Sequence, residues 1–259
     1  MKIAALQATG AVGSAQDNRE TLEAAARQAA LEGAELLVTP ELFVSGYDPL
    51  RVHADDGDQQ RDWIAGIAAA AGIRIVASSV EQQRSSTYIT ASIFDRNGQE
   101  LTRYRKQHLF GDAENTVFTA GTTPPELVRV GEFTAALGIC FDIEFPEFVR
   151  EQALRGADLL LIPTAVPLRV EIDVGSPTLD TRLMSTLLVP ARALESQLFI
   201  VYANHAGPAF SGTSTIADPY GRRLTTAGDT ANELVTADLD FALVQRARAD
   251  IGYLSFFNR

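Results

Sequence analysis

Short apolar segments alternate with amphipathic ones along the whole chain, and this alternation is the strongest constraint on its fold. An apolar stretch of five to eight residues is typical of a buried strand, and apolar residues three or four apart indicate a helix. The expected strands of the first third are residues 2–8, 35–39 and 73–80, and the helices between them are residues 17–31 and 59–71. This β-α-β order predicts strands packed beneath helices.

Two hairpin signals interrupt the alternation. Asp95-Arg-Asn-Gly98 lies between two strand-like halves of residues 87–105, and Asp218-Pro-Tyr-Gly221 lies between residues 212–217 and 222–225. The remaining expected strands are residues 133–140, 158–162, 198–203 and 233–238. The remaining expected helices are residues 147–155, 190–196 and 241–249. The helix 190–196 could start earlier, and Pro190 would then kink it. The sequence therefore predicts an α/β fold with mixed sheets covered by helices.

Composition narrows the class of protein. Hydrophobic residues make up 46% and charged residues 21% of the 259, with no linker between segments, so we expect one globular domain over residues 1–259. Asp and Glu outnumber Lys and Arg by 33 to 22, and the basic residues are scattered, which argues against nucleic acid as a partner. We find no signal peptide and no membrane span, and a lone cysteine forbids an internal disulfide. These features favour a cytoplasmic protein.

The lone cysteine, Cys140, lies where the expected strand 133–140 meets the acidic and aromatic stretch Phe141-Asp-Ile-Glu-Phe-Pro-Glu147. A thiol at a strand end, shortly before a helix, is a candidate nucleophile because oriented amides at a helix start stabilise a thiolate. The alternative is that Cys140 is one more small buried hydrophobe. Whether Cys140 is a nucleophile or a buried hydrophobe has to be judged from the other segments of the sequence.

Two further segments place a reactive side chain at or just after a strand end, where open α/β sheets usually have their sites. They supply a carboxylate, Glu41, and an ammonium, Lys106. Glu41 could instead begin a helix, and Lys106, beside Arg103 and Arg105, could belong to a solvated charged edge. His108 could be a pH-sensitive group or, alternatively, a structural histidine. The three histidines at 53, 108 and 205 show no metal-ligand spacing, so we expect no metal. A carboxylate, an ammonium and a thiol together can take a thiol proton and stabilise a developing oxyanion.

The combination of segments resembles the nitrilase or carbon-nitrogen hydrolase superfamily over nearly the whole chain. Glu, Lys and Cys occur in that order, in the blocks Pro-Glu41-Leu-Phe-x-x-Gly-Tyr, Tyr-x-Lys106-x-His-Leu-Phe and Gly-x-Cys140-x-Asp-x-x-Phe-Pro-Glu. Two scaffold blocks, Val189-Pro-Ala-Arg-Ala-Leu-Glu195 and Gly212-Thr-Ser-x-x-x-Asp218-Pro-Tyr-Gly221, add to the likeness.

The resemblance implies an α-β-β-α sandwich and a cysteine hydrolase without a cofactor. It implies Glu41 as general base, Cys140 as nucleophile and Lys106 as stabiliser of the tetrahedral intermediate. Glu114 would orient the amine of the substrate, unless it is a surface carboxylate in a loop, and the Phe141 amide would complete the oxyanion hole. A small-molecule amide would be the substrate, and the subunits would pair through helices into a homodimer or a higher oligomer.

The residues after the cysteine favour amides. Phe141-Asp142 stands where nitrile-cleaving members carry Trp-Glu, so the likeness ranks an amidase of small aliphatic or amino-acid-derived amides first. An ω-amidase or N-carbamoyl amine hydrolase follows, then a nitrilase. A catalytically silent scaffold and a glutaminase component remain as other classes, although no phosphate-binding loop of a synthetase occurs here.

Some features depart from the family. Ser196 replaces a common Asn, and the stretch 162–167 lacks the usual Asn or Trp, which makes the expected pocket wall near Thr164 and Val166 unusual. The stretch 169–186 could be a lid or a plain loop. The chain ends at Arg259, short of the tail that many relatives extend across a dimer partner, so the form of any dimer stays open.

Overall fold

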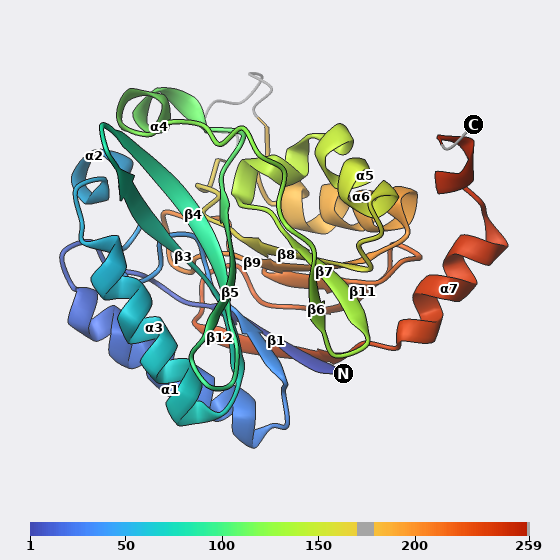
Figure 1. The fold of residues 1–259 in the computed structure, drawn as a ribbon, viewed down its shortest axis with the longest axis horizontal. Helices are drawn as coiled ribbons and strands as arrows, with labels where there is room; N and C mark the ends of the chain where they lie inside the picture. Colours follow the sequence, from blue (N-terminus) through green and yellow to red (C-terminus); the bar gives the residue numbers. More distant parts are fainter. Residues whose placement is uncertain (170–178, 258–259) are drawn as a thin grey trace.

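The computed structural model describes residues 1–169 and 179–257, so residues 170–178 of the predicted lid or loop and the last two residues fall outside it. Within the described residues the strands form two six-stranded sheets (Figure 1). The first sheet has the order β12-β1-β2-β3-β4-β5. Its strands are β1 (Lys2–Gln7), β2 (Leu36–Val38), β3 (Arg74–Gln83), β4 (Ser86–Phe94), β5 (Glu100–Arg105) and β12 (Glu233–Asp238).

The second sheet has the order β11-β10-β9-β8-β7-β6. Its strands are β6 (Val128–Val130), β7 (Phe133–Leu137), β8 (Leu159–Pro163), β9 (Phe199–Ala203), β10 (Thr215–Ala217) and β11 (Arg223–Thr226). Each sheet contains three adjacent parallel strands, β1, β2 and β3 in the first and β7, β8 and β9 in the second, flanked by antiparallel ones. The prediction of mixed sheets is confirmed.

Helices cover the outer face of each sheet. Helices α1 (Ala15–Leu31) and α3 (Gly57–Ala71) pack on the first sheet, and α5 (Pro146–Leu154) and α6 (Val189–Ser196) lie beside the second (Figure 1). The alternation along β1 explains this arrangement, because Ala4 and Leu6 join the core beneath α1 and α3 while Ile3 and Ala5 join the core between the sheets. The layers follow the order α-β-β-α, as expected.

Both predicted hairpins are present. Asp95 accepts hydrogen bonds from the backbone N–H groups of Asn97 and Gln99, each at 2.8 Å, and so closes the turn between β4 and β5. Asp218 does the same between β10 and β11, with the N–H groups of Tyr220 at 2.9 Å and Arg222 at 3.0 Å. Short polar side chains that bond their own following backbone are what make these turns predictable from sequence.

Two features differ from the expectation or were missed, and one expected alternative is confirmed. The strand expected over residues 133–140 ends at Leu137, and Cys140 begins a 3₁₀ helix, η1 (Cys140–Glu144), that precedes α5. The helix around Pro190 does start earlier, as a π-helical turn, η2 (Met184–Leu188). The elements that periodicity did not reveal are β6, α2 (Pro49–Val52), α4 (Gly111–Val117) and the 3₁₀ turn η3 (Leu254–Phe256) after α7 (Phe241–Asp250), because none of those missed is long enough to show a pattern.

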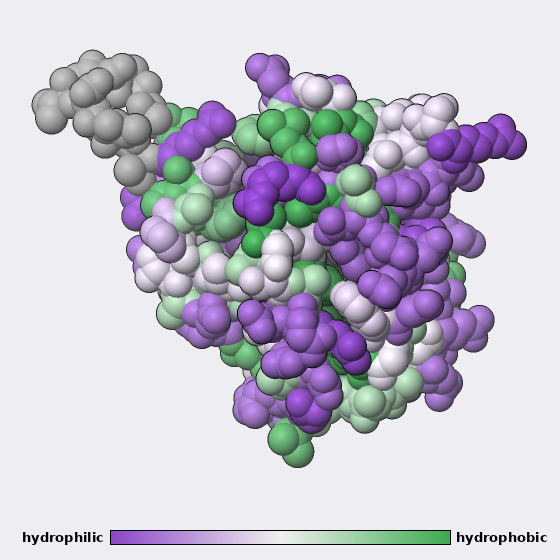
Figure 2. Space-filling view, turned by 90° about the vertical axis from the view of Figure 1, so that its left-hand side faces the viewer, coloured by the Kyte–Doolittle hydropathy of each residue, from purple (hydrophilic) through white to green (hydrophobic). Residues whose placement is uncertain are grey.

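The surface agrees with the acidic composition. Hydrophilic side chains cover much of the face on the α2 and α4 side, with hydrophobic ones gathered mainly in its upper half (Figure 2). Among the helices of the described residues, none has the length and apolarity needed to cross a membrane.

Candidate active site

The three predicted catalytic residues follow strands of both sheets and meet where the sheets join. Glu41 follows β2, Lys106 follows β5 and Cys140 follows β7. The joint is made by backbone: the N–H of Glu41 donates to the carbonyl of Thr164 beyond β8 at 3.1 Å, and Ala8 pairs with His205 beyond β1 and β9. The carboxyl ends of the two sets of parallel strands therefore hold one site between them.

A lysine between two carboxylates forms the charged part of the site. Lys106 Nζ donates to Glu41 Oε1 at 2.8 Å and to Glu114 Oε1 and Oε2 at 2.8 and 2.9 Å, and all three side chains are fully buried. Burial alone would lower the pKa of Lys106, but the charges of Glu41 and Glu114 raise it above its usual value. Lys106 is thus a permanent buried cation, and the alternatives of a solvated Lys106 and a surface Glu114 are excluded.

Glu41 has one carboxylate oxygen free. Its Oε2 is buried and has no hydrogen-bond partner in the described part of the chain. Burial raises the pKa of Glu41 to about 7, with Lys106 opposing the rise and the charge of Glu114 adding to it. A carboxylate with a free oxygen and a pKa near neutrality is suited to accept and return a proton. It does not begin a helix, because it lies in the turns between β2 and α2.

Cys140 is held in an unusual backbone conformation beside Glu41. Its φ is 45°, in the left-handed region that a residue with a side chain rarely adopts, and the residue is 4% exposed. Burial and the charge of Glu41 raise the pKa of the thiol well above its usual value, against the lowering effect of Lys106. The expectation of a thiolate stabilised by a helix start is therefore wrong: although Cys140 begins η1, burial and the charge of Glu41 favour the neutral thiol.

A small cavity opens at the sulfur. Its volume is about 50 Å³, and Phe110, Phe141 and Val166 contribute to its mostly apolar wall. Phe110 and Phe141 meet edge to face with ring centroids 5.2 Å apart. Of the two positions expected in the wall, Val166 lines the cavity, whereas the hydroxyl of Thr164 turns back to the carbonyl of Ile162 at 3.1 Å. The cavity admits only a short chain beside the thiol.

The N–H of Phe141 lies in the first turn of η1, next to the sulfur. The first N–H groups of a helix lack partners within the helix, and no acceptor meets this one in the described residues. Together with the ammonium group of Lys106, this N–H provides two hydrogen-bond donors near the Cys140 sulfur. This is the arrangement that a developing oxyanion requires.

Comparison with known proteins decides the family. The model of the carbon-nitrogen hydrolase family matches residues 2–249. The chain belongs to the carbon-nitrogen hydrolase family. A hydrolase encoded in the pqqF 5′ region of Pseudomonas protegens is 38% identical over 244 residues, which are 88% of this chain and 80% of the relative. The 2-oxoglutaramate amidase of Bacillus subtilis is 33% identical, over 84% of this chain and 83% of the relative.

Solved structures agree. A variant of the amidase from Nesterenkonia sp. AN1 is 36% identical, covers 96% of this chain and 94% of its own, and superposes with a TM-score of 0.85. That protein carries the acetamide moiety of fluoroacetamide on its active-site cysteine. The prediction of an amidase-like member of the nitrilase superfamily, a hydrolase of carbon–nitrogen bonds, is confirmed.

Asp142 connects two catalytic blocks of this carbon-nitrogen hydrolase, a role that the sequence alone did not reveal. Its buried carboxylate accepts hydrogen bonds from Tyr104 Oη at 3.0 Å, from the N–H of His108 at 3.0 Å and from the N–H of Ile139 at 2.9 Å. His108 Nδ1 lies 2.8 Å from the same carboxylate, so the structural alternative for this histidine is the correct one. Asp142 thereby holds the Lys106 block against the Cys140 turn. The signal was its place two residues after Cys140, opposite the Tyr-x-Lys-x-His block.

Tyr47 and His205 were also missed as parts of the site. Tyr47 Oη donates to Glu114 Oε1 at 2.5 Å. His205 Nδ1 accepts from the N–H of Gly10 at 3.4 Å, so its Nε2 carries the proton that it donates to the carbonyl of Glu41 at 2.7 Å. Burial lowers the pKa of His205 to about 4, which keeps it neutral. Tyr47 ends the Glu41 block, but His205 has no motif around it that could have revealed its role.

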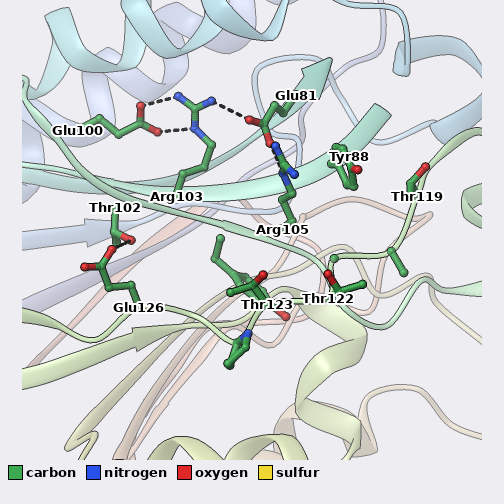
Figure 3. Close-up of a pocket in the computed structure, with 14 residues that line it drawn as sticks. Glu81, Tyr88, Glu100, Thr102, Arg103, Arg105, Thr119, Thr122, Thr123 and Glu126 are labelled. Atoms are coloured by element: carbon green, nitrogen blue, oxygen red, sulfur yellow. Dashed lines mark hydrogen bonds and ion pairs between the residues drawn. The ribbon is translucent and has the colours of Figure 1, made fainter. Parts of the chain in front are cut away.

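A larger groove elsewhere is lined mainly by charged and hydroxyl side chains (Figure 3). It has a volume of about 640 Å³ and lies along β5 and residues 119–126. Its two arginines are paired, Arg103 with Glu100 at 2.7 Å and Arg105 with Glu81 at 2.6 Å, so their charges are balanced locally. Within residues 1–169 and 179–257 no group of His, Cys, Asp and Glu side chains is arranged to hold a metal ion.

Proposed function

We propose that the protein hydrolyses a small amide to a carboxylic acid and ammonia, with Cys140 as nucleophile. The observation that carries this proposal is a neutral buried thiol beside the carboxylate of Glu41, whose Oε2 has no hydrogen-bond partner among the described residues and whose pKa is about 7. A thiol with a raised pKa needs a base to become a nucleophile. Glu41 is the base within its reach.

Acylation follows from the positions of the three groups. Glu41 takes the thiol proton while the sulfur attacks the amide carbon, and the carbonyl electrons move to the oxygen. Lys106 and the N–H of Phe141 stabilise this oxyanion. As the carbon–nitrogen bond breaks, Glu41 gives its proton to the nitrogen, ammonia leaves, and an acyl thioester remains on Cys140.

Deacylation reverses the roles with water in place of ammonia. Glu41 removes a proton from water, the resulting hydroxide attacks the thioester carbon, and the same two donors hold the oxyanion. The carbon–sulfur bond then breaks and the sulfur regains its proton. One carboxylate serves both halves because its pKa lies near the working pH.

Glu114 supports the lysine. Its Oε1 accepts from Lys106 and Tyr47, and its Oε2 accepts from Lys106 and from the N–H of Phe110 at 2.8 Å. With both oxygens engaged, Glu114 holds Lys106 in place and keeps it charged. We therefore propose that Glu114 orients Lys106 and that the polar cluster of these two residues orients the amine group of the substrate.

The size of the cavity favours a short amide. The cavity at the sulfur has a volume of only about 50 Å³ and a mostly apolar wall. A related amidase with 36% identity has been solved with butyramide. An ω-amidase activity is the second candidate, because the 2-oxoglutaramate amidase is 33% identical. N-carbamoyl amine hydrolysis and nitrile hydrolysis rank lower. A catalytically silent scaffold also ranks lower, because a scaffold would not need Glu41, Lys106, Glu114 and Cys140 together.

Ammonia release tests the proposal. Wild type and Cys140→Ala would be assayed on butyramide, 2-oxoglutaramate, glutamine, an N-carbamoyl amine and a nitrile. We expect butyramide turnover that disappears in Cys140→Ala and persists in Glu147→Gln, a matched control on an exposed side chain. Turnover retained by Cys140→Ala would contradict the mechanism. Turnover of glutamine alone would favour the ammonia-supplying alternative, and silence of wild type on every compound would favour the scaffold.

We also propose a homodimer built on the helical face of the second sheet. Leu183, Leu187 and Leu194 are 41%, 62% and 37% exposed, and their spacing of four and seven residues places them along one side of η2 and α6. Light scattering after gel filtration tests it, with Leu187→Glu expected to yield the monomer. The lone reduced thiol that the mechanism needs supports a cytoplasmic location.

A further inference from the structure

The cavity at Cys140 contains a carboxylate that the proposed mechanism does not use. Glu144 ends the 3₁₀ helix η1 that Cys140 begins, and it lines the same cavity as the sulfur. Apart from Glu144, the lining that the structure describes is largely apolar, with Phe110, Phe141 and Val166 among its members. A charged side chain in such a wall calls for a partner.

Among residues 1–169 and 179–257, no side chain forms an ion pair or hydrogen bond with the Glu144 carboxylate. The guanidinium of Arg192, whose charge acts on Glu144, donates to the backbone carbonyl of Ile143 at 3.1 Å, to the backbone carbonyl of Glu144 at 2.9 Å and to the carboxylate of Glu195 at 2.9 Å. Arg192 therefore fixes the backbone of the turn without bonding the Glu144 carboxylate. In the described part of the chain no hydrogen bond or ion pair reaches that carboxylate.

The surroundings leave Glu144 partly desolvated. Burial raises the pKa of its carboxyl, and the charges of Arg192 and Lys106 only oppose the rise. Lys106 in turn is balanced by two carboxylates of its own, Glu41 and Glu114. Among the described residues, the cavity thus presents a carboxylate without a bonded cation, in the same lining as the reacting sulfur.

We propose that Glu144 selects amides whose short acyl chain ends in an ammonium group. This inference rests on the proposed amidase function and names its substrate class. An ammonium ion in the cavity would donate to the Glu144 carboxylate while the amide carbon lies at Cys140, and the apolar wall would enclose the methylene groups between them. A substrate with a carboxylate at the same position would meet like charge at Glu144.

One cation near the cavity could act in the opposite direction. Arg169 lies at its rim, with the guanidinium carbon 5.5 Å from the centroid of the Phe110 ring. Arg169 is exposed, so solvent screens its attraction for an anionic chain. The attraction of the partly buried Glu144 for a cationic chain is screened less. The two residues predict opposite orders of substrate preference, and this makes the inference testable.

The experiment compares kcat/KM for β-alaninamide, which carries an ammonium group, with that for butyramide, its neutral isostere, and for malonamate, which carries a carboxylate. We expect wild type to prefer β-alaninamide over butyramide. In Glu144→Gln the ratio of the two should fall by about tenfold or more, because the variant replaces a charged hydrogen-bond acceptor of the ammonium group by a neutral one. In Glu147→Gln, an exposed carboxylate of α5, the ratio should not change.

The outcomes separate the two proposals. The role of Glu144 would be overturned, and the amidase function would stand, in either of two cases. In the first, butyramide is turned over but Glu144→Gln does not change the ratio of kcat/KM for β-alaninamide to that for butyramide. In the second, wild type prefers malonamate. No turnover of any amide would overturn both. If Glu144→Gln fails to fold, inhibition of wild type decides: propylammonium should inhibit butyramide hydrolysis at lower concentration than propionate, and the reverse order would refute the inference.

Discussion

Replacing Glu41 by Gln should change how the stability of the protein depends on pH. Glu41 is fully buried, and its pKa rises from 4.5 to about 7 on folding, first because of burial. Below pH 4.5 the side chain is protonated in both the folded and the unfolded chain. Between these two values the unfolded chain loses the proton while the folded chain keeps it, so the stability that protonated Glu41 contributes is lost as the pH rises through 7.

The magnitude follows from the shift. A difference of about two and a half pKa units corresponds to about 3 kcal/mol at about 1.4 kcal/mol per unit. Most of this difference is still present at pH 5 and almost none at pH 8. Gln has nearly the same shape as protonated Glu and does not titrate. Relative to wild type, Glu41→Gln should therefore gain about 2 to 3 kcal/mol in the free energy of unfolding between pH 5 and pH 8.

Urea denaturation at both pH values measures this difference. Glu147→Gln is the control, because that side chain is exposed and the variant should follow wild type. Glu41→Gln should also lose amide turnover, since it removes the proposed base. A difference between variant and wild type that does not depend on pH, or that moves against the variant as the pH rises, would refute the assignment of a raised pKa to Glu41.

Four other predictions concern the same cluster. Lys106→Met leaves the buried carboxylates of Glu41 and Glu114 without a cation, so we expect a loss of about 3 to 5 kcal/mol in urea denaturation at pH 8 and no turnover; wild-type stability would contradict it. Tyr47→Phe removes the donor to Glu114 Oε1 and should cost about 1 to 2 kcal/mol with a fall in kcat, and an unchanged kcat would argue against a role in the site. For wild type, kcat/KM should rise with pH to a plateau with a midpoint near 7, because the ionised form of Glu41 is the base, and a flat profile from pH 6 to 8 would rule this out. Asp142→Ala should lower kcat more than it raises KM, because it releases the Cys140 turn; a change in KM alone would disagree.

Much of the fold could be predicted because its determinants are local. The turn at Asp95 is closed by hydrogen bonds to the second and fourth residues that follow, so the sequence there is sufficient to recognise it. The alternation along β1 and the spacing in α1 indicate which face of each is buried. Short elements such as β6 and α4 carry too few residues for a pattern, and they exist because longer neighbours position them.

The order of Glu41, Lys106 and Cys140 was also visible in the sequence, together with the resemblance to the family, and it was sufficient to predict the reaction class. The sequence could not show how these side chains titrate. We expected a thiolate at Cys140, but the thiol is buried beside a carboxylate, and burial is a property of the whole fold. A pKa depends on groups that lie far apart in the chain, as Lys106 and Glu41 do at 65 positions.

The remaining features of the site were decided by tertiary structure alone. Asp142 contacts residues 34 and 38 positions away, and His205 bonds the carbonyl of Glu41 across 164 positions. Glu144 is one acidic residue among many in the sequence, and only the fold places it in the cavity with the sulfur while Arg192 turns to the backbone. The sequence by itself determined which chemical groups are available and which local elements form. The packing of two sheets determined which of those groups lose water and meet, because desolvation and contact depend on residues that the chain brings together from its whole length.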